Sequence, residues 1–157
     1  MGSTHVREKL IEFNADYVRC IDSDQLERWP SFFAEQCHYR ITTEENLNEG
    51  LQAGLVYANS RSMLVDRISA LRNANIYERQ KYRHVVGLPT PSVLEGQQFE
   101  CETPFLIVRI VQGNETFLYT TGIYKDVYQM TDDSLQLVSR IVVCDSFRFD
   151  TLLAVPL

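Results

Sequence analysis

Apolar and polar residues alternate along the stretch from Phe99 to Cys144, which predicts three long strands joined by two tight turns. The first strand covers residues 105–111 and ends at Gly113-Asn114, a dipeptide typical of a two-residue hairpin. Asp132-Asp133 is expected to form the second turn. The side chains expected to share a face are Phe117, Tyr119, Thr121, Ile123 and Val127 on the second strand, and Leu135, Leu137, Ile141 and Val143 on the third.

The first strand is apolar on its other face as well, because Leu106, Val108 and Ile110 lie between its inward positions. A sheet that is apolar on both faces needs cover on both. The rest of the chain must therefore supply helices, or the protein must find a partner.

Helical spacing of apolar residues appears in three segments. The spacing of Val6, Leu10, Phe13 and Tyr17 predicts an amphipathic helix over residues 5–20. Asp22 followed by Gln25 has the pattern of a capping box, so a second helix is expected there, shortened or bent by Pro30. Ser60 is expected to cap a third helix that ends near residues 73–75. The inward side chains of the third helix are expected to be Met63, Leu64, Ile68 and Leu71.

Shorter strands are predicted at residues 37–42, 51–58 and 82–88, with loops at 44–49 and 90–96. Helices early and antiparallel strands late predict an α+β fold, with three helices packed on one face of a strongly curved, mostly antiparallel sheet. Such a sheet closed by helices makes a cone with an interior pocket. The pattern resembles the cone-shaped fold shared by nuclear transport factor 2, ketosteroid isomerase and scytalone dehydratase. Residues 1–157 are expected to form one domain, with 145–157 as a C-terminal interface tail.

Net charge, hydropathy and cysteine content limit the binding partners and the cellular location to be expected. The net charge of −6 makes nucleic acid and anionic membranes poor partners. No apolar run approaches the ~20 residues of a membrane span, so a cytoplasmic location is expected. The four cysteines, Cys20, Cys37, Cys101 and Cys144, form no C-x-x-C pair and are expected to be buried free thiols.

Among the titratable residues, His84 is the strongest candidate for a catalytic role. In a cone enzyme it could pair with Asp66 as a base, which would make the chain a stand-alone isomerase or dehydratase. The alternative without catalysis is a structural role, in which His84 lies in a strand and hydrogen-bonds a neighbouring residue. The tyrosines could line a pocket for a small ligand or could pair across strands. Three dispersed histidines do not make a metal site, and no catalytic, cofactor-binding or metal-ligating residue is predicted.

Two segments suggest a protein partner. Residues 72–84 carry four Arg or Lys side chains against only Glu78, which suits either a solvated surface or an acidic partner. The tail contains many apolar side chains for a terminus that would otherwise fray. The residues predicted to lie at a subunit interface are Arg79, Tyr82, Arg83, His84, Phe147, Phe149 and Pro156.

Several motifs along the chain carry a family likeness. They are residues 66–71, 74–79, Tyr82-Arg83-His84 and Gly87-Leu88-Pro89, together with 21–24, 29–33, Cys37-His38-Tyr39-Arg40, Cys144-Asp145-Ser146 and Asp150-Thr151-Leu152. With these motifs the sequence resembles the small (β) subunits of Rieske-type aromatic-ring-hydroxylating dioxygenases. Within that family it is most similar to the terephthalate dioxygenase small subunits.

The resemblance implies a non-catalytic subunit that holds an α3β3 hexamer together. The partners would be the Rieske large (α) subunit and other copies of this chain, and the substrate would be a terephthalate-like aromatic carboxylate. The Rieske [2Fe-2S] cluster and the mononuclear Fe(II) would belong to the large subunit. The present sequence is consistent with this, because it lacks the C-x-H and C-x-x-H ligand pairs. The isolated chain is then expected to be inactive.

Overall fold

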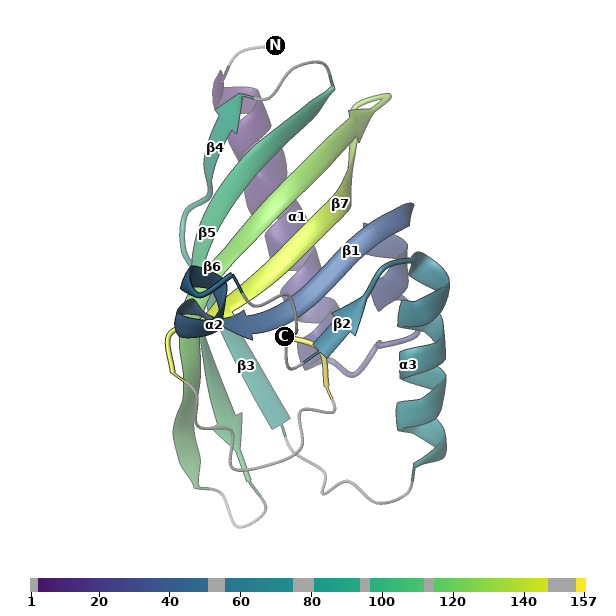
Figure 1. The fold of residues 1–157 in the computed structure, drawn as a ribbon, viewed down its shortest axis with the longest axis vertical. Coiled ribbons are helices and arrows are strands. Elements are labelled where there is room, and N and C mark those ends of the chain that lie inside the picture. The colour runs from purple at the N-terminus through teal and green to yellow at the C-terminus, as the bar shows by residue number, and fades with distance from the viewer. Residues whose placement is uncertain (1–2, 51–55, 75–80, 94–96, 112–114, 147–154) are drawn as a thin grey trace.

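The computed structural model describes residues 3–50, 56–74, 81–93, 97–111, 115–146 and 155–157 (Figure 1). The helical elements are α1 (Ser3–Asp22), the 3-10 turn η1 (Trp29–Phe32), α2 (Glu44–Asn48) and α3 (Arg61–Asn73). The strands are β1 (Phe33–Thr43), β2 (Val56–Ala58), β3 (Lys81–Val86), β4 (Thr90–Val93), β5 (Gln98–Ile110), β6 (Thr116–Thr131) and β7 (Ser134–Cys144). No helix in these ranges is long and apolar enough to cross a membrane.

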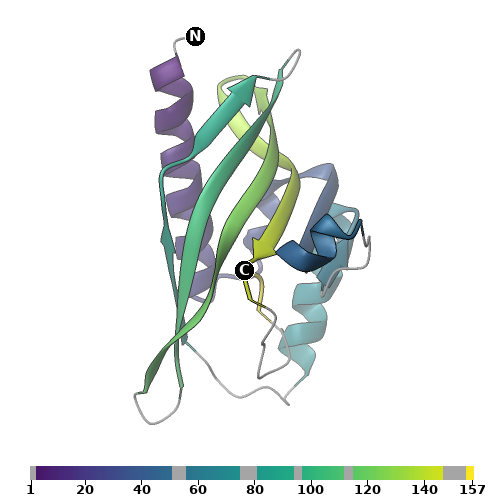
Figure 2. The ribbon, with the colours of Figure 1, turned by 60° about the vertical axis from the view of Figure 1, so that its left-hand side comes forward.

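The strands form one sheet in the order β2-β1-β7-β6-β5-β3, and β4 pairs with β5 beside β3. All pairings are antiparallel except β1 with β7, which is parallel. The sheet curls strongly, with α1 along one side and α3 at the other (Figure 2). The predicted α+β class and the curved, mostly antiparallel sheet are confirmed.

The long three-stranded unit is confirmed as β5, β6 and β7. Asp132 and Asp133 have φ angles of 47° and 68°, the left-handed values that a tight primed turn between twisted strands requires. Aspartate tolerates this conformation better than most residues. The other predicted turn, Gly113-Asn114, lies outside the described residues.

Two of the three predicted helices are confirmed. The helix over residues 5–20 is α1, and its residues Leu10 and Tyr17 are fully buried. The helix after Ser60 is α3, and the Ser60 hydroxyl accepts a hydrogen bond from the backbone N–H of Met63. The prediction that Met63 points inward was wrong, because its side chain is 39% exposed.

The second predicted helix was wrong. Asp22 is the last residue of α1 and caps nothing, and Asp24 reverses the chain with a φ of 61°. The backbone N–H of Gln25 then donates to the Cys20 carbonyl, which closes the end of α1. Only the 3-10 turn η1 follows, with Pro30 as its second residue, before β1 begins.

Both loop predictions were also wrong in part. Thr43 accepts a hydrogen bond from the Asn46 N–H and so begins the short helix α2, where a loop was expected at 44–49. Residues 90–93 form β4, which pairs with residues 99–102 of β5. Pro91 is tolerated there because β4 lies at an edge of the sheet.

The predicted faces of β6 and β7 were wrong in part, because two register shifts interrupt the alternation. One lies between Ile107 and Val108 in the β5–β6 pairing, and the other between Val127 and Tyr128 in the β6–β7 pairing. Each extra residue moves the following side chains to the other face of the strand. The buried side chains are Tyr119, Thr120, Tyr124, Asp126 and Tyr128 on β6, and Leu137, Arg140, Val142, Val143 and Cys144 on β7. Tyr119, Leu137 and Val143 were expected on the predicted faces.

Gly122 lies in β6 at a position with no room for a side chain. It pairs with Phe105 on one side and Cys144 on the other. A Cβ atom at this position would overlap the Val143 carbonyl oxygen and contact the Phe105 ring.

We expect Gly122→Ala to lower the free energy of unfolding by about 2 kcal/mol, as overpacking of a filled core does. Urea denaturation measures this, and Thr131→Ala at the exposed end of the same strand is the control. An unchanged urea midpoint for Gly122→Ala would contradict the packing described here.

Candidate functional site

A buried ion pair lies at the centre of the cone interior. Arg140 of β7 and Asp126 of β6 are directly opposite in the strand register, and both side chains are 0% exposed. The guanidinium Nε and Nη2 each donate to one oxygen of the carboxylate, at 2.8 Å in both cases. Nη2 also donates to Asn14 Oδ1 of α1 at 2.8 Å. This bidentate geometry is the strong form of an arginine–carboxylate contact. It also joins α1 to the sheet.

Two tyrosine rings lie against the guanidinium. The Arg140 Cζ lies 4.2 Å from the centroid of the Tyr17 ring and 4.1 Å from that of Tyr124. A cation over aromatic rings gains attraction that partly replaces its lost hydration. Burial lowers the pKa of Arg140, but Asp126 and Tyr128 more than offset this, so the pKa is raised and the side chain stays charged.

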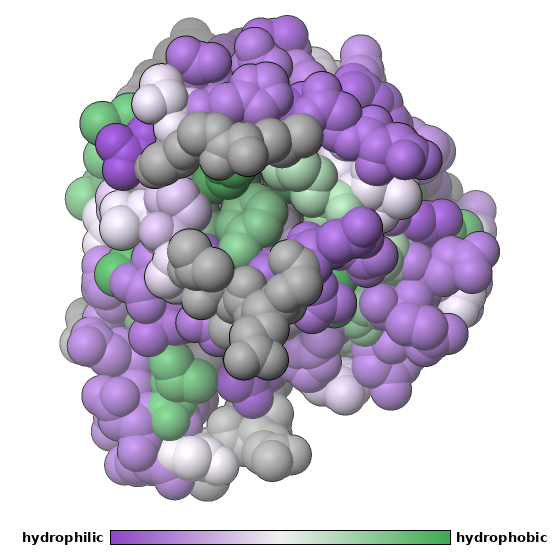
Figure 3. Space-filling model, turned by 90° about the horizontal axis from the view of Figure 1, so that it is seen from above, coloured by the Kyte–Doolittle hydropathy of each residue, from purple (hydrophilic) through white to green (hydrophobic). Residues whose placement is uncertain are grey.

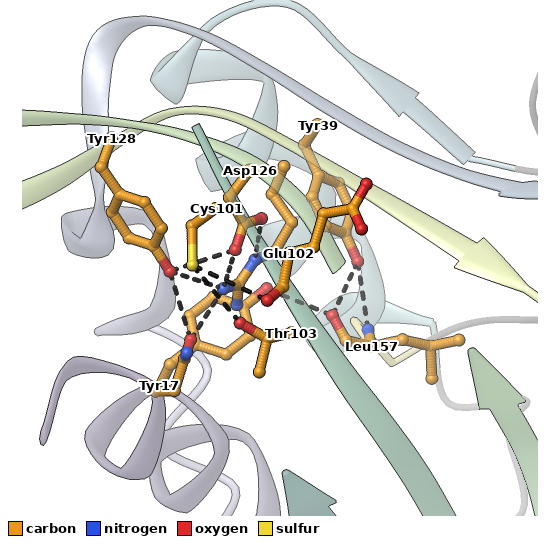
Figure 4. Close-up of polar contacts among 10 residues, drawn as sticks. Tyr17, Tyr39, Cys101, Glu102, Thr103, Asp126, Tyr128 and Leu157 are labelled. Atoms are coloured by element: carbon orange, nitrogen blue, oxygen red, sulfur yellow. Dashed lines mark hydrogen bonds and ion pairs between the residues drawn. The ribbon is translucent and has the colours of Figure 1, made fainter. Parts of the chain in front are cut away.

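The interior hydroxyls are donors rather than bases. Burial raises the pKa of Tyr39, Tyr124 and Tyr128 well above the ordinary value for tyrosine, so these side chains stay protonated at neutral pH. The Tyr128 hydroxyl donates to Asp126 Oδ2 at 3.1 Å. Tyr128 and Asp126 are therefore hydrogen-bonded to each other in the interior (Figure 4), and Arg140 donates to both.

Leu157 lies at the same site. Its backbone carbonyl oxygen accepts hydrogen bonds from the hydroxyls of Tyr17 and Tyr39, each at 3.2 Å. Figure 4 shows Leu157 on the Tyr39 side of the cluster and Tyr128 on the opposite side. Seen from above, the surface is mostly hydrophilic around a hollow with hydrophobic side chains, beside residues that are not described (Figure 3).

The hypothesis that His84 pairs with Asp66 was wrong. Asp66 is exposed on α3, whereas the partner of His84 is Asp22 at the end of α1. His84 Nδ1 lies 2.6 Å from Asp22 Oδ1, and the backbone N–H of His84 donates to Oδ2 at 2.8 Å. The carboxylate thus connects α1 to the edge strand β3. Among the described residues, His84 Nε2 has no hydrogen-bond partner.

The residues predicted to lie at a subunit interface are placed differently from one another. Tyr82 and His84 are buried on the inner face of β3, and Arg83 between them is exposed. Pro156 is buried. Three further members of the set, Arg79, Phe147 and Phe149, lie outside the described residues. Their interface role stays a prediction.

The predicted basic segment 72–84 is partly neutralised within the chain. Arg72 donates to Glu27 at 2.7 Å and to Asp24 at 2.9 Å, so it stabilises the turn after α1. Lys81 and Arg83 are exposed on β3. The exposed positive charge of the described part of this segment therefore comes from β3.

The four cysteines are buried free thiols, as predicted. Among the described residues, no group of three or more His, Cys, Asp or Glu side chains is placed to hold a metal ion.

The sequence reasoning missed Asp126 and Arg140. An uninterrupted hairpin around Asp132-Asp133 would place Asp126 opposite Ser139, and the register shift places it opposite Arg140 instead. The available signal was the occurrence of one acidic and one basic residue at nearly equal distances from the turn, each within an apolar strand. Buried charges in such a setting are normally paired.

Comparison with known proteins identifies relatives over nearly the whole chain. Residues 17–150 match the family described as "Ring hydroxylating beta subunit". The chain is 49% identical, over 95% of its length and 97% of the relative, to a terephthalate 1,2-dioxygenase terminal oxygenase subunit beta 1 from Comamonas sp.. It is 38% identical, over 90% of its length and 88% of the relative, to an anthranilate 1,2-dioxygenase small subunit from Burkholderia cepacia.

A solved structure agrees in fold. The crystal structure of the beta subunit of a proposed aromatic-ring-hydroxylating dioxygenase from Novosphingobium aromaticivorans superimposes with a TM-score of 0.91. The two chains are 34% identical, and the match covers 99% of each. The predicted cone-like fold, of the type of nuclear transport factor 2, is confirmed by this likeness.

Removing one member of the buried ion pair tests its role in stability. We expect Asp126→Asn to lower the free energy of unfolding by about 3–5 kcal/mol, because Arg140 then remains buried without a counter-charge. Glu102→Gln is the control, since Glu102 pairs with Lys125 at 3.6 Å where both side chains are exposed. That substitution should cost less than about 1 kcal/mol. Equal urea midpoints for the two variants would show that the buried pair does not stabilise the fold.

Proposed function

The chain belongs to the ring-hydroxylating dioxygenase beta-subunit family, and from this premise we propose that its own task is to hold the oxygenase together. It is the beta subunit of an aromatic-ring-hydroxylating dioxygenase, one part of a multi-subunit oxidoreductase that also contains a large subunit. We propose that the assembly is an α3β3 hexamer and that the isolated chain is inactive. The network around Arg140 supports this, because Asp126, Asn14 and Tyr128 are engaged in hydrogen bonds within the chain.

We propose that the complex oxidises an aromatic carboxylate of the terephthalate type. The single observation that carries this is the 49% identity over 95% of the chain to a terephthalate 1,2-dioxygenase beta subunit. The anthranilate 1,2-dioxygenase small subunit, at 38% identity, acts with an enzyme whose named substrate is also an aromatic carboxylate. We further propose that the Rieske cluster and the Fe(II) are in the large subunit, since this sequence lacks the C-x-H and C-x-x-H ligand pairs.

A stand-alone isomerase or dehydratase is not favoured. Asp66, its proposed second residue, is exposed and does not contact His84. We place the complex in the cytoplasm, where four buried free thiols would stay reduced.

The outer face of the sheet is our proposed contact surface for the large subunit. Arg83 is paired with Val108, and Val108 is paired with Leu118 on its other side, so the three side chains share a face. Val85 lies on the same face and is 52% exposed, and Leu118 is 66% exposed. Large exposed apolar side chains beside an arginine are typical of protein interfaces. We propose that the tail, residues 145–157, adds Phe147 and Phe149 to the contact.

Co-expression with the large subunit of the same dioxygenase tests the function. We expect equimolar subunits to purify together as a hexamer by light scattering, and to convert terephthalate with a higher kcat/KM than anthranilate. The purified lone chain should contain no stoichiometric iron and show no turnover. Iron or turnover in the lone chain would refute the structural role, and a preference for anthranilate would refute only the substrate.

Substitutions on the outer face test the docking surface separately. We expect Val85→Asp and Leu118→Asp to abolish co-purification with the large subunit, because each would bury an unpaired charge in the contact. Their melting temperatures should stay near that of the parent chain, since both side chains are already exposed. The control is Val65→Asp on α3, which is 50% exposed and lies elsewhere. If all three variants assemble normally, the contact surface is not this face.

A further inference from the structure

Residues 155–157 lie inside the fold rather than along its surface. Leu157 is 1% exposed and belongs to the main hydrophobic core, and Val155 packs against that core. Three hydrogen bonds hold the Leu157 backbone. Its N–H donates to the Tyr39 hydroxyl at 3.1 Å, and its carbonyl oxygen accepts from the Tyr39 and Tyr17 hydroxyls at 3.2 Å each. The two tyrosines come from β1 and α1, so the site is built by elements far apart from this segment in the chain.

Aromatic rings brace the two hydroxyls. The Tyr39 ring packs edge-on against Trp29 at 5.1 Å and Phe33 at 5.8 Å between centroids. The Tyr17 ring packs in the same way against Phe32 at 5.4 Å, and Arg140 lies over its face. These contacts hold both hydroxyls in place before anything binds them. A preorganised site of this kind loses little entropy when it takes up a ligand.

Residues 155–157 bind the Tyr17–Tyr39 site in the way that a ligand would. Leu157 supplies one N–H donor, one backbone oxygen acceptor and one branched apolar side chain. The single hydroxyl of Tyr39 hydrogen-bonds both backbone groups. A site with apolar walls and a few placed polar groups is the usual design of a small-molecule pocket.

We propose that the cone interior at Tyr17 and Tyr39 is a binding site for a short hydrophobic peptide with a leucine side chain, which the chain fills with its own residues 155–157. A free peptide of the same chemistry binds there once Leu157 is expelled. This inference does not depend on assembly with a large subunit, and it holds for the isolated chain.

The test uses the full-length chain with Leu157→Lys, because a lysine without a counter-charge cannot stay buried in this core and the segment must leave the site. The probe is the peptide acetyl-Val-Pro-Leu-amide, and acetyl-Leu-Pro-Val-amide is the control of equal composition. We expect saturable one-to-one binding of the first peptide by calorimetry, with a rise in melting temperature. The parent chain should bind it at least about tenfold more weakly, because its own segment competes at high effective concentration. No binding to the folded Leu157→Lys chain, or equal binding of both peptides, would overturn the proposal.

Two further measurements keep the test decisive. If the Leu157→Lys chain does not fold, circular dichroism must show that the probe peptide, and not its control, restores the folded spectrum. Failure to restore it counts against the site.

In the Leu157→Lys background, Tyr39→Phe removes two hydrogen bonds and should weaken binding of the probe peptide by about tenfold or more. Tyr57→Phe is the matched control, because that tyrosine is 48% exposed on β2. Equal affinity in the two tyrosine variants would show that the Tyr39 hydroxyl does not form the site.

Discussion

The cone is organised around a positive charge that has been removed from water. A guanidinium in the interior is costly unless its charge is balanced and its N–H groups are bound. Asp126 supplies the charge, Asn14 and Tyr128 supply further contacts, and two tyrosine rings lie against the guanidinium. These groups come from α1, β6 and β7, so their contacts set how the helix lies on the sheet. The interaction therefore links the helix to both strands.

The same arrangement brings the C-terminal residue to the network. The charged pair and the protonated tyrosines lie in the interior, and the backbone oxygen of Leu157 accepts a hydrogen bond from Tyr17. His84, the residue that most resembled a catalytic base, is used to connect β3 to the end of α1 through Asp22.

The elements that were predicted correctly are those whose signal lies within a few neighbouring residues of the sequence. The Ser60 cap, the Asp132-Asp133 turn and the apolar spacing of α1 each correspond to an element of the structure. Two failures arose where a distant contact decided the outcome, whereas the Thr43 cap that begins α2 is a local signal that was missed. The pattern from Asp22 to Gln25 suits a cap, yet Asp22 is held by His84, which is 62 residues away in the chain. The faces of β6 and β7 were missed because an unpaired extra residue inverts the alternation, and no pattern within a single strand reveals where its partner shifts. The family likeness was visible in the sequence, but the interior ion pair was not.

The parallel pairing of β1 with β7 has a consequence for how the molecule is made. Residues 38–43 pair with residues 139–144, so about a hundred residues must leave the ribosome between the first strand and its neighbour. At a synthesis rate of ~5–20 residues per second, the edge of β1 that pairs with β7 stays unpaired for ~5–20 s. Contacts of such long range also slow the folding search itself. The nascent chain therefore presents an unsatisfied strand to its surroundings for most of its synthesis, and folding of the sheet is completed only after translation has nearly ended.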